Sequence, residues 1–594
     1  MNELLILKKQ KISQYTHKLF IAVLFVFFSA TSLLHAQGFG EDAGIGMSTI
    51  DEGLLKFGLY GHDSVFIGYE AKTADSGVVG GGVVELEQGS VIRGDLYSFG
   101  DLVTNGNKNY QVFNGDLVVL GDAYLNDGFQ VDGSFYVQGD LRIGGASKAN
   151  IIEGSTHVGE LFSMAYSNEF KGGVVVAQDS IITTSDYSAN FFGTPPVELR
   201  AFVLRSGVHS APQLLWSTPF TMPEHFDTKA YDVPTTVVNP GTNNITVLQD
   251  VSWDATMGSE PINGVKIAPN GNQVLPPGSY GHLKMEYNSE LALGEGIYHF
   301  ASIDMAATLL NVKVYQPNGG RTQILVEGDI TLGHKNNIMP YDTVGNKGGT
   351  ILIYSNGKLT IGQENEIWAT LIAPNATLDM TYYPKLFGQA FAKVIVAPQY
   401  FEGNDGRYVP FYPAKPKIGL AFAEGNLVPE GSGGGTKIFP LTFSLEHENG
   451  LPVTVYFHTE FRSPAGPGHA DADDINLIAK DSVMFEPGET KVVYDKLLIN
   501  KDDDFELDDY FDLILDSVVN AELDSIAENN IYSLGIENDD PAPEMNFADP
   551  DDLLVDEAVG SINLAVKLTN KSVLESVAEI VVQSKVRSEE RRVG

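Results

Sequence analysis

Acidic side chains gather at four places in the last third of the sequence, each beside a turn or at the end of a strand-like run. The residues are Glu430, Asp471, Asp473, Asp474, Asp502, Asp503, Asp504, Glu506, Asp539 and Asp540. Ca²⁺ takes about six to eight oxygen ligands, and carboxylates that converge repel each other unless a cation neutralises them. These residues can therefore form a calcium site if the fold brings them together. If it does not, they remain a solvated acidic rim.

The overall composition favours cations as partners. The chain has 77 Asp and Glu against 38 Lys and Arg, which gives a formal net charge of -39. This charge repels phosphate backbones and anionic lipid, so nucleic-acid binding is not expected. The chain has no cysteine, which excludes disulfides, thiolate metal sites and a thiol nucleophile. Any metal must be held by oxygen, with the 12 histidines as a minor source of ligands.

The acidic stretch carries the pattern of a folded, strand-rich domain. From Asp471 to Asp540 there are 21 acidic residues, four lysines and no arginine, yet apolar alternation persists. Strands are predicted over residues 439–445, 453–457, 492–494, 497–499 and 510–515. Several short strands broken by Pro-Gly and Asp clusters indicate an antiparallel β-sandwich. The acidic residues then fall at the ends of its strands.

The order of motifs in this region resembles that of a Calx-beta domain, over about residues 416–540. The motifs are Val428-Pro429-Glu430-Gly431, Val453-Thr454-Val455-Tyr456, Val483 to Thr490, Ile499 to Phe511, and Ile536 to Asp540. Phe485-Glu486-Pro487-Gly488-Glu489 and the closing Asn538-Asp539-Asp540 are the most specific parts. The resemblance implies an immunoglobulin-like β-sandwich.

The same resemblance implies a calcium site at one end of that sandwich. In calcium-binding members, carboxylates meet there from the first Glu-Gly, the loop after the third strand, the double-aspartate loop and the terminal aspartates. By position these are Glu430, Asp473 or Asp474, Asp502, Asp503, Glu506, and Asp539 or Asp540. Asp504 belongs to the candidate set because the run Asp502-Asp503-Asp504 leaves the register open by one position.

A short motif, Gly-Asp-Leu or a close variant, recurs in the first part of the chain. It stands at residues 94–96, 100–102, 115–117, 121–123 and 139–141. Gly94 and Gly100 are six residues apart, as are Gly115 and Gly121, and the second pair follows the first at a distance of 21 residues. Three faces of about six residues make one coil of a parallel β-helix, with Gly and Asp at the corners. We therefore predict stacked coils in which Leu96, Leu102, Leu117 and Leu141 point inward.

A second, less regular series runs from about residue 266 to 400. It includes Leu371-Ile372-Ala373-Pro374 and Val394-Ile395-Val396-Ala397-Pro398, two strands followed by Ala-Pro. Residues 37–413 are accordingly predicted as one right-handed parallel β-helix-like domain, with an irregular insertion at about 185–260. In texture this domain resembles the β-helical regions of bacterial surface and polymer-forming proteins.

The two ends of the chain carry further signals. Lysines 8, 9, 11 and 18 precede an apolar run from Leu19 to Phe28, which predicts a cleaved signal peptide over residues 1–36 and no transmembrane helix in the mature chain. A Pro-bearing joint near Tyr412 predicts a domain boundary at 413/414. Residues 541–586 repeat the start of the acidic domain and are predicted to be a second, truncated Calx-beta copy. Residues 587–594 match a translated sequencing adapter.

The sequence as a whole indicates an exported, non-catalytic cell-surface or extracellular protein with a structural or adhesive role. Its expected partners are calcium ions, with surface polysaccharide or other cell-surface proteins as candidates. The alternative is a β-helix carbohydrate-active enzyme or carbohydrate-binding protein with Calx-beta accessory domains, because such helices host polysaccharide lyases and hydrolases. No Gly-x-Ser-x-Gly elbow, His-Glu-x-x-His helix or phosphate loop occurs in the sequence. Adhesion ligand and oligomeric state stay open.

Overall fold

A computed structural model of the chain describes its residues in five ranges. They are residue 45, residues 51–210, residues 222, 226 and 228–236, residues 264–548, and residues 561–580, apart from gaps at 75–76, 106–109, 127, 145–149, 166–167, 173, 177–179, 184–186, 192–199, 205–206, 318, 342–348, 404–408, 410, 413, 422–425 and 464–467. The predicted signal peptide, the adapter-like end and most of the predicted insertion lie outside them. In the described part, strands β1 to β51 are joined by turns and two short 3-10 helices, η2 (Glu52–Lys56) and η4 (Ala527–Asn530).

The chain forms two compact units: the first takes in the described residues up to Pro416 together with 447–453 and 486–489, and the second takes in the remaining described residues. In neither unit do the described residues include a helix that is long and apolar enough to cross a bilayer. Nearly all regular structure in both units is β-strand.

The first unit begins with layers of three strands, and each strand pairs in parallel with the corresponding strand of the next layer. The first ladder is β3 (Val91–Ile92), β6 (Gln111–Phe113), β9 (Phe129–Val131), β12 (Asn150–Ile152), β15 (Asn168–Phe170) and β18 (Tyr187–Phe191). The second is β4 (Leu96–Ser98), β7 (Leu117–Val119), β10 (Phe135–Val137), β13 (Thr156–Val158) and β16 (Val174–Val176). The third is β5 (Leu102–Asn105), β8 (Ala123–Leu125), β11 (Leu141–Ile143), β14 (Phe162–Met164) and β17 (Ser180–Thr183). At the end of these ladders, β19 (Arg200–Leu204) and β20 (Gly207–Ser210) pair antiparallel with β18 and β17.

Each residue of the Gly-Asp-Leu motif has a separate role in this stack. The side chain of Asp101 accepts a hydrogen bond from the Asp122 N–H (2.9 Å), and Asp122 accepts one from the Asp140 N–H (2.8 Å). A Cβ on Gly121 would collide with Asp101 Oδ1, so glycine is needed for the layers to approach. The leucine that follows faces inward, and Leu96, Leu102, Leu117 and Leu141 are all buried. The predicted stacking of the repeats with inward leucines is therefore confirmed.

The second series forms layers of the same kind. One ladder is β22 (Asn272–Leu275), β25 (Glu290–Leu293), β28 (Asn311–Val314), β31 (Asn337–Pro340), β34 (Glu366–Ile367), β36 (Lys385–Leu386) and β38 (Glu402–Gly403). The next is β23 (Gly278–Ser279), β26 (Gly296–Phe300), β29 (Thr322–Val326), β32 (Ile351–Ser355), β35 (Thr370–Met380) and β37 (Ala390–Ala397). The last is β21 (Val265–Ile267), β24 (His282–Met285), β27 (Ser302–Met305), β30 (Ile330–Leu332) and β33 (Leu359–Ile361), which also ends on β35.

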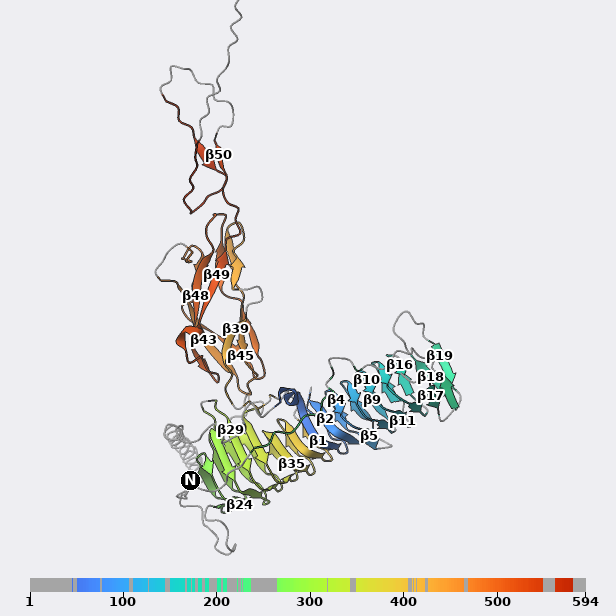
Figure 1. Cartoon of the computed structure of the whole chain (residues 1–594). Helices are drawn as coiled ribbons and strands as arrows, with labels where there is room; N and C mark the ends of the chain where they lie inside the picture. Colours follow the sequence, from blue (N-terminus) through green and yellow to red (C-terminus); the bar gives the residue numbers. More distant parts are fainter. Residues whose placement is uncertain are drawn as a thin grey trace, which may run out of the picture. The chain divides into compact units, whose positions relative to one another are not determined.

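The second series stacks in front of the first, although it follows the first in the sequence. Strand β1 (Phe57–Ile67) pairs in parallel with β2 (Val78–Glu87) on one side and with β37 on the other. The end of the second series therefore stacks on the start of the first, and Figure 1 shows β1 in blue beside the yellow strands near β35. We call the β1–β37 pairing the seam. Gln389 reinforces it, because its Nε2 donates to the carbonyls of Leu55 (2.8 Å) and Phe57 (2.7 Å).

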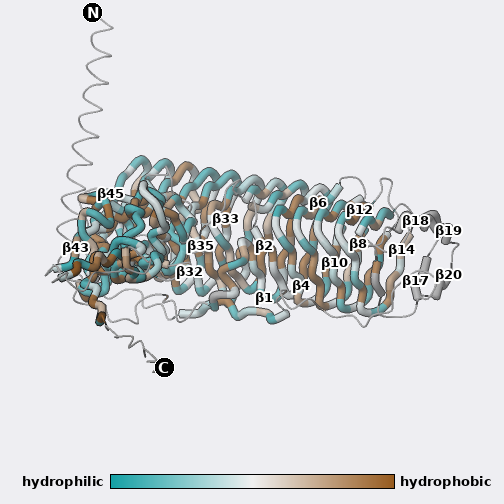
Figure 2. Tube along the Cα trace, turned by 90° about the horizontal axis from the view of Figure 1, so that it is seen from above, coloured by the Kyte–Doolittle hydropathy of each residue, from teal (hydrophilic) through white to brown (hydrophobic). Residues whose placement is uncertain are grey.

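Hydrogen bonds at one corner also run through the seam without interruption. The Tyr383 N–H donates to Gln399 O, the Tyr400 N–H to Tyr69 O, and the Glu70 N–H to Gln88 O. The rings of Tyr383 and Tyr400 stack with their centroids 4.6 Å apart. The two series thus form one continuous stack with a shared apolar core, and hydrophobic residues colour parts of its strands brown in Figure 2.

An apolar stripe on the outer surface of the stack is covered by other parts of the first unit. The stripe includes Tyr354, Phe391, Tyr60 and Tyr97, and Phe226, Tyr231 and Phe411 lie in the same buried cluster. Tyr60 Oη donates to Tyr231 O (2.8 Å) and accepts from the Tyr231 N–H (2.7 Å). Phe226 contacts Tyr136 of the first series and the Thr236 N–H donates to Tyr354 Oη of the second, so the described residues between 226 and 236 reach both sides of the seam.

The second unit contains three sheets that share an apolar core, together with a separate hairpin. The sheets are β39 (Ile418–Ala421), β42 (Leu441–Leu445) and β46 (Lys491–Tyr494); β40 (Leu427–Pro429), β49 (Ile531–Glu537), β48 (Asp509–Val519), β43 (Val453–Phe461) and β45 (Asp481–Phe485); and β41 (Gly435–Ile438), β47 (Leu498–Lys501) and β44 (Ile475–Asn476). The hairpin is β50 (Met545–Phe547) and β51 (Val566–Leu568). Alternate residues of β42 and β43 are buried, and the Phe443 and Phe457 rings pack 4.9 Å apart between two of the sheets. The predicted strands are present.

Candidate metal centre

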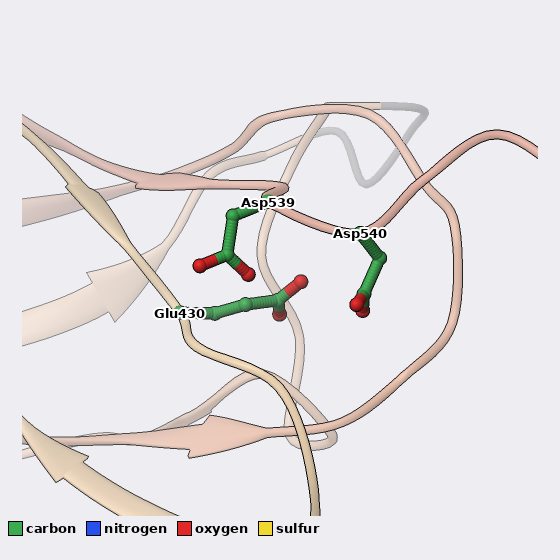
Figure 3. Close-up of side chains that lie close together, drawn as sticks. All are labelled: Glu430, Asp539 and Asp540. Atoms are coloured by element: carbon green, nitrogen blue, oxygen red, sulfur yellow. The ribbon is translucent and has the colours of Figure 1, made fainter.

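Two neighbouring strand ends bring the first acidic residues together. Strand β40 pairs in parallel with β49, with Val428 opposite Ile536 and Pro429 opposite Glu537. Glu430 follows β40 directly, and its N–H donates to Glu537 O (3.1 Å). Parallel strands end at the same edge of a sheet, so Glu430 lies beside the residues that follow β49, Asp539 and Asp540 (Figure 3).

Two loops add carboxylates from the other strands. Residues 502–508 connect β47 to β48, and residues 471–474 precede β44. The Asn500 N–H donates to Asp474 O (2.7 Å), which ties the second loop to β47. Asn538 Nδ2 donates to Glu506 O (2.9 Å), which ties the first loop to the end of β49. The four acidic segments therefore meet at one end of the unit, which we call the acidic pole.

Among the described residues, the carboxylates of the acidic pole form three groups. Within each group, one oxygen from every member lies within 4.8 Å of the others. The groups are Glu430, Asp539 and Asp540; Glu430, Asp502 and Glu506; and Asp474, Glu506 and Asp509. Glu430 belongs to two groups, and so does Glu506. These two glutamates therefore link all the others into one cluster.

Two carboxylates of the cluster are buried, and each has one oxygen that accepts no hydrogen bond from the residues that the structure describes. Glu430 is 2% exposed and Asp540 is 8% exposed. Among the described residues, neither Glu430 Oε1 nor Asp540 Oδ2 has a hydrogen-bond partner. A buried carboxylate oxygen without a donor is costly unless a proton or a cation accompanies it. The donor set, made only of oxygens, suits a hard cation such as Ca²⁺.

The pKa values of three carboxylates at the pole are raised, so their protonated forms are favoured. Burial, with Asp502 and Asp540 nearby, raises the pKa of Glu430 to about 8. Burial and the charges of Asp474 and Asp509 raise the pKa of Glu506 to about 8 as well. The pKa of Asp509 rises to about 6 for the same reasons. A bound cation would favour the charged form of each carboxylate and so oppose these shifts.

Of the predicted residues, six belong to the groups and three do not. Glu430, Asp474, Asp502, Glu506, Asp539 and Asp540 are brought together. Asp503 Oδ1 instead accepts the Gly433 N–H (2.8 Å), and Asp504 pairs with Lys571. The Asp473 N–H donates to Asp471 Oδ1 (2.7 Å). The structure thus selects Asp474 from the pair that the sequence left open, and brings both Asp539 and Asp540 to the pole.

Asp509 is the group member that the sequence analysis missed. It is the first residue of β48 and lies one position before the strand that the sequence predicts over residues 510–515. Its oxygen nevertheless lies within 4.8 Å of those of Asp474 and Glu506. The Asp508-Asp509 pair beside the acidic loop was the signal that could have indicated it.

The raised pKa values predict a pH dependence for the metal-free protein. Glutamate in an unfolded chain titrates near about 4.3. Between that pH and about 8, the folded chain therefore holds protons on Glu430 and Glu506 that the unfolded chain has lost. Stability falls with rising pH wherever the folded state binds more protons. Thermal unfolding in chelator should give a lower melting temperature at pH 8 than at pH 5.

Trp368 packs against a neighbouring aromatic ring. Its ring stacks on Phe387 with centroids 4.1 Å apart, and its Nε1 donates to Glu366 Oε1 (2.8 Å). One face of the indole is therefore covered. Trp216 and Trp253 lie outside the described residues.

Comparisons with known proteins give limited similarity. No family model matches the chain, and no curated protein matches it significantly. Among solved structures, the apo form of the Calx CBD1 domain matches with 18% identity and a TM-score of 0.16, covering 21% of this chain and 99% of that one. The calcium-binding domain CBD12 of CALX1.1 matches with 21% identity and CBD12 from CALX1.2 with 20%. Both have a TM-score of 0.17, and each match covers 25% of this chain and 56% of that one.

Proposed function

We propose that the second unit is a calcium-binding module and that the acidic pole is its calcium site. The observation that carries this proposal is Glu430, a carboxylate that is 2% exposed, has an oxygen without a donor and faces two further groups of acidic side chains. Hydrogen bonds from the protein do not neutralise it. A divalent cation would.

The residues would share the ion-binding work in a defined way. Glu430 and Glu506 would bridge neighbouring positions, since each belongs to two groups. Asp539 and Asp540 would supply oxygens beside Glu430, and Asp474 and Asp509 would supply them beside Glu506. Asp502 would contribute to the position that the two glutamates share. Ca²⁺ accepts irregular sets of oxygen ligands, whereas Mg²⁺ requires a near-octahedral arrangement. Calcium is therefore the better match for carboxylates that arrive from four separate segments.

Calorimetric titration of the full chain with CaCl₂ tests this proposal. Extracellular modules bind with a Kd of about 10⁻⁴–10⁻³ M, and we expect a value in that range. Binding to the folded state alone raises stability by about 2.7 kcal/mol at a hundredfold excess over Kd. The melting temperature should therefore fall when chelator is added. If millimolar calcium gives no heat and chelator leaves the melting temperature unchanged, the pole is a solvated acidic rim.

We also propose a setting for this module: an exported, non-catalytic cell-surface or extracellular protein with a structural or adhesive role. The layered first unit would be a right-handed parallel β-helix, and the second an immunoglobulin-like sandwich of the Calx-beta type. The continuous stack supports a scaffold role, because its interior is filled with apolar side chains that run through both series. A panel of acidic and neutral polysaccharides provides the test. Cleavage of any of them would contradict the non-catalytic role.

A further inference from the structure

The segment that follows strand β51 contacts the loop that carries two of the candidate ligands. The Phe505 N–H donates to Lys571 O (3.1 Å), and the Val573 N–H donates to Phe505 O (3.2 Å). These bonds form a parallel bridge between Phe505 and Ser572. Phe505 lies between Asp502 and Glu506 in sequence, so the bridge is made at the middle of the candidate calcium loop.

The side chain of Lys571 extends from this bridge towards the acidic pole. Its ammonium group pairs with Asp504 Oδ2. The Asp504 N–H donates in turn to Asp502 Oδ1 (2.7 Å), and Asp502 belongs to a candidate calcium group. The hydrogen bond to Asp504 raises the pKa of Lys571, and the charges of Asp504, Asp502 and Asp473 add to the effect. A positive charge is thus held within the field of the pole.

We propose that Lys571 is a tethered cation that lowers the affinity of the acidic pole for calcium. This inference rests on the proposed function. The ammonium group neutralises part of the negative charge that attracts Ca²⁺, and it repels an ion bound nearby. For a unit charge about 6–12 Å from Ca²⁺ in the dielectric of water, this repulsion corresponds to roughly a three- to tenfold change in affinity before screening by salt. Lys571 acts only through its charge, because a protonated ammonium group has no lone pair with which to bind a cation.

The linkage is reciprocal. If Lys571 weakens calcium binding, then calcium weakens the docking of Lys571 on Asp504 by the same factor. Residues 569–573 would therefore loosen from the loop as the pole fills. The segment after β51 would sense calcium without supplying a ligand.

Side-chain replacement can isolate the charge, because the bridge to Phe505 uses only the backbone of Lys571. Lys571→Met keeps the length of the side chain and removes the ammonium group. Lys571→Arg keeps the charge. Lys567→Met removes a lysine from β51, in the same hairpin, and serves as the matched control. The Lys571 side chain is 74% exposed, so none of these changes should disturb the core.

Calorimetric titration of the four full-length chains with CaCl₂ at low ionic strength is the test. We expect Lys571→Met to bind calcium three- to tenfold more tightly than the parent, and Lys571→Arg and Lys567→Met to bind like the parent. If Lys571→Met were the only one of the four chains to bind calcium measurably, that result would also support the inference. Equal affinities for Lys571→Met and Lys567→Met, or weaker binding by Lys571→Met, would overturn it and leave the calcium site intact. No heat from any of the four chains would overturn the calcium site as well.

Discussion

Replacing Glu430 and Glu506 together by glutamine is expected to abolish the stabilisation of the chain by calcium. Both residues belong to two of the three carboxylate groups, so their replacement removes a charged ligand from every group. Glutamine keeps the volume and one oxygen of each side chain, which preserves the packing. About 2.7 kcal/mol of calcium-dependent stability, the gain at a hundredfold excess over Kd, should be lost. In chelator the variant should be at least as stable as the parent at pH 8, because the buried charge of Glu430 and the half-buried charge of Glu506 are gone.

Thermal unfolding of parent and variant, in calcium and in chelator, measures both effects. Asp503→Asn is the matched control, since Asp503 lies on the same loop but accepts the Gly433 N–H and is absent from the groups. The control should keep most of its response to calcium. Full stabilisation of the double variant by calcium, or an equal loss in the control, would contradict the assignment of the two glutamates as shared ligands.

Replacing Ile395 by aspartate is expected to disrupt both halves of the stacked first unit at once. Ile395 is fully buried in β37 and pairs with Leu378 on one side and with Val65 of β1 on the other. A carboxylate there would be buried without a partner in an apolar interior. We expect the free energy of unfolding to fall by about 4 kcal/mol or more, because the core loses an apolar contact and the new carboxylate loses its hydration.

Hydrogen exchange resolved by peptide is the measurement for this variant. Amides of β2 and of β35 should both lose protection, because the seam joins the two series into one stack. Lys393→Ser serves as the control on the same strand, because Lys393 is exposed and its exposed ion pair with Asp63 of β1 adds little stability. Lost protection confined to residues 265–397 would show that the first series is stable without the seam.

The layers could be predicted from the sequence, whereas the order of their joining could not. Gly, Asp and Leu recur at a local spacing, and each acts locally: glycine allows close approach, aspartate accepts a hydrogen bond from the next layer, and leucine fills the interior. The seam depends on a pairing between β1 and β37, which are far apart in sequence. Nothing in the composition of Phe57–Ile67 distinguishes β37 from any other strand as its neighbour.

The candidate site was predictable to the level of its segments. Glu430, Asp502, Glu506 and the terminal aspartates stand at strand ends, and strand ends of one sheet edge converge. Individual positions within a run of acids were not predictable. Asp503 accepts a hydrogen bond from the Gly433 N–H, and Asp504 pairs with Lys571. Both partners are distant in sequence, so the acidic run itself does not indicate these contacts.

The seam also sets a condition on how the first unit folds. Gln389 and Phe57, which are hydrogen-bonded across it, are 332 positions apart in the chain. Long loops must close before such contacts form, and proteins dominated by distant pairings fold slowly. During synthesis the strand that begins the first series keeps one open edge until the last strand of the second series has been made. An open edge is a site for pairing with other chains. The order of the two series therefore gives a newly made chain a long interval in which it can associate wrongly, and its yield on refolding should decrease as protein concentration rises.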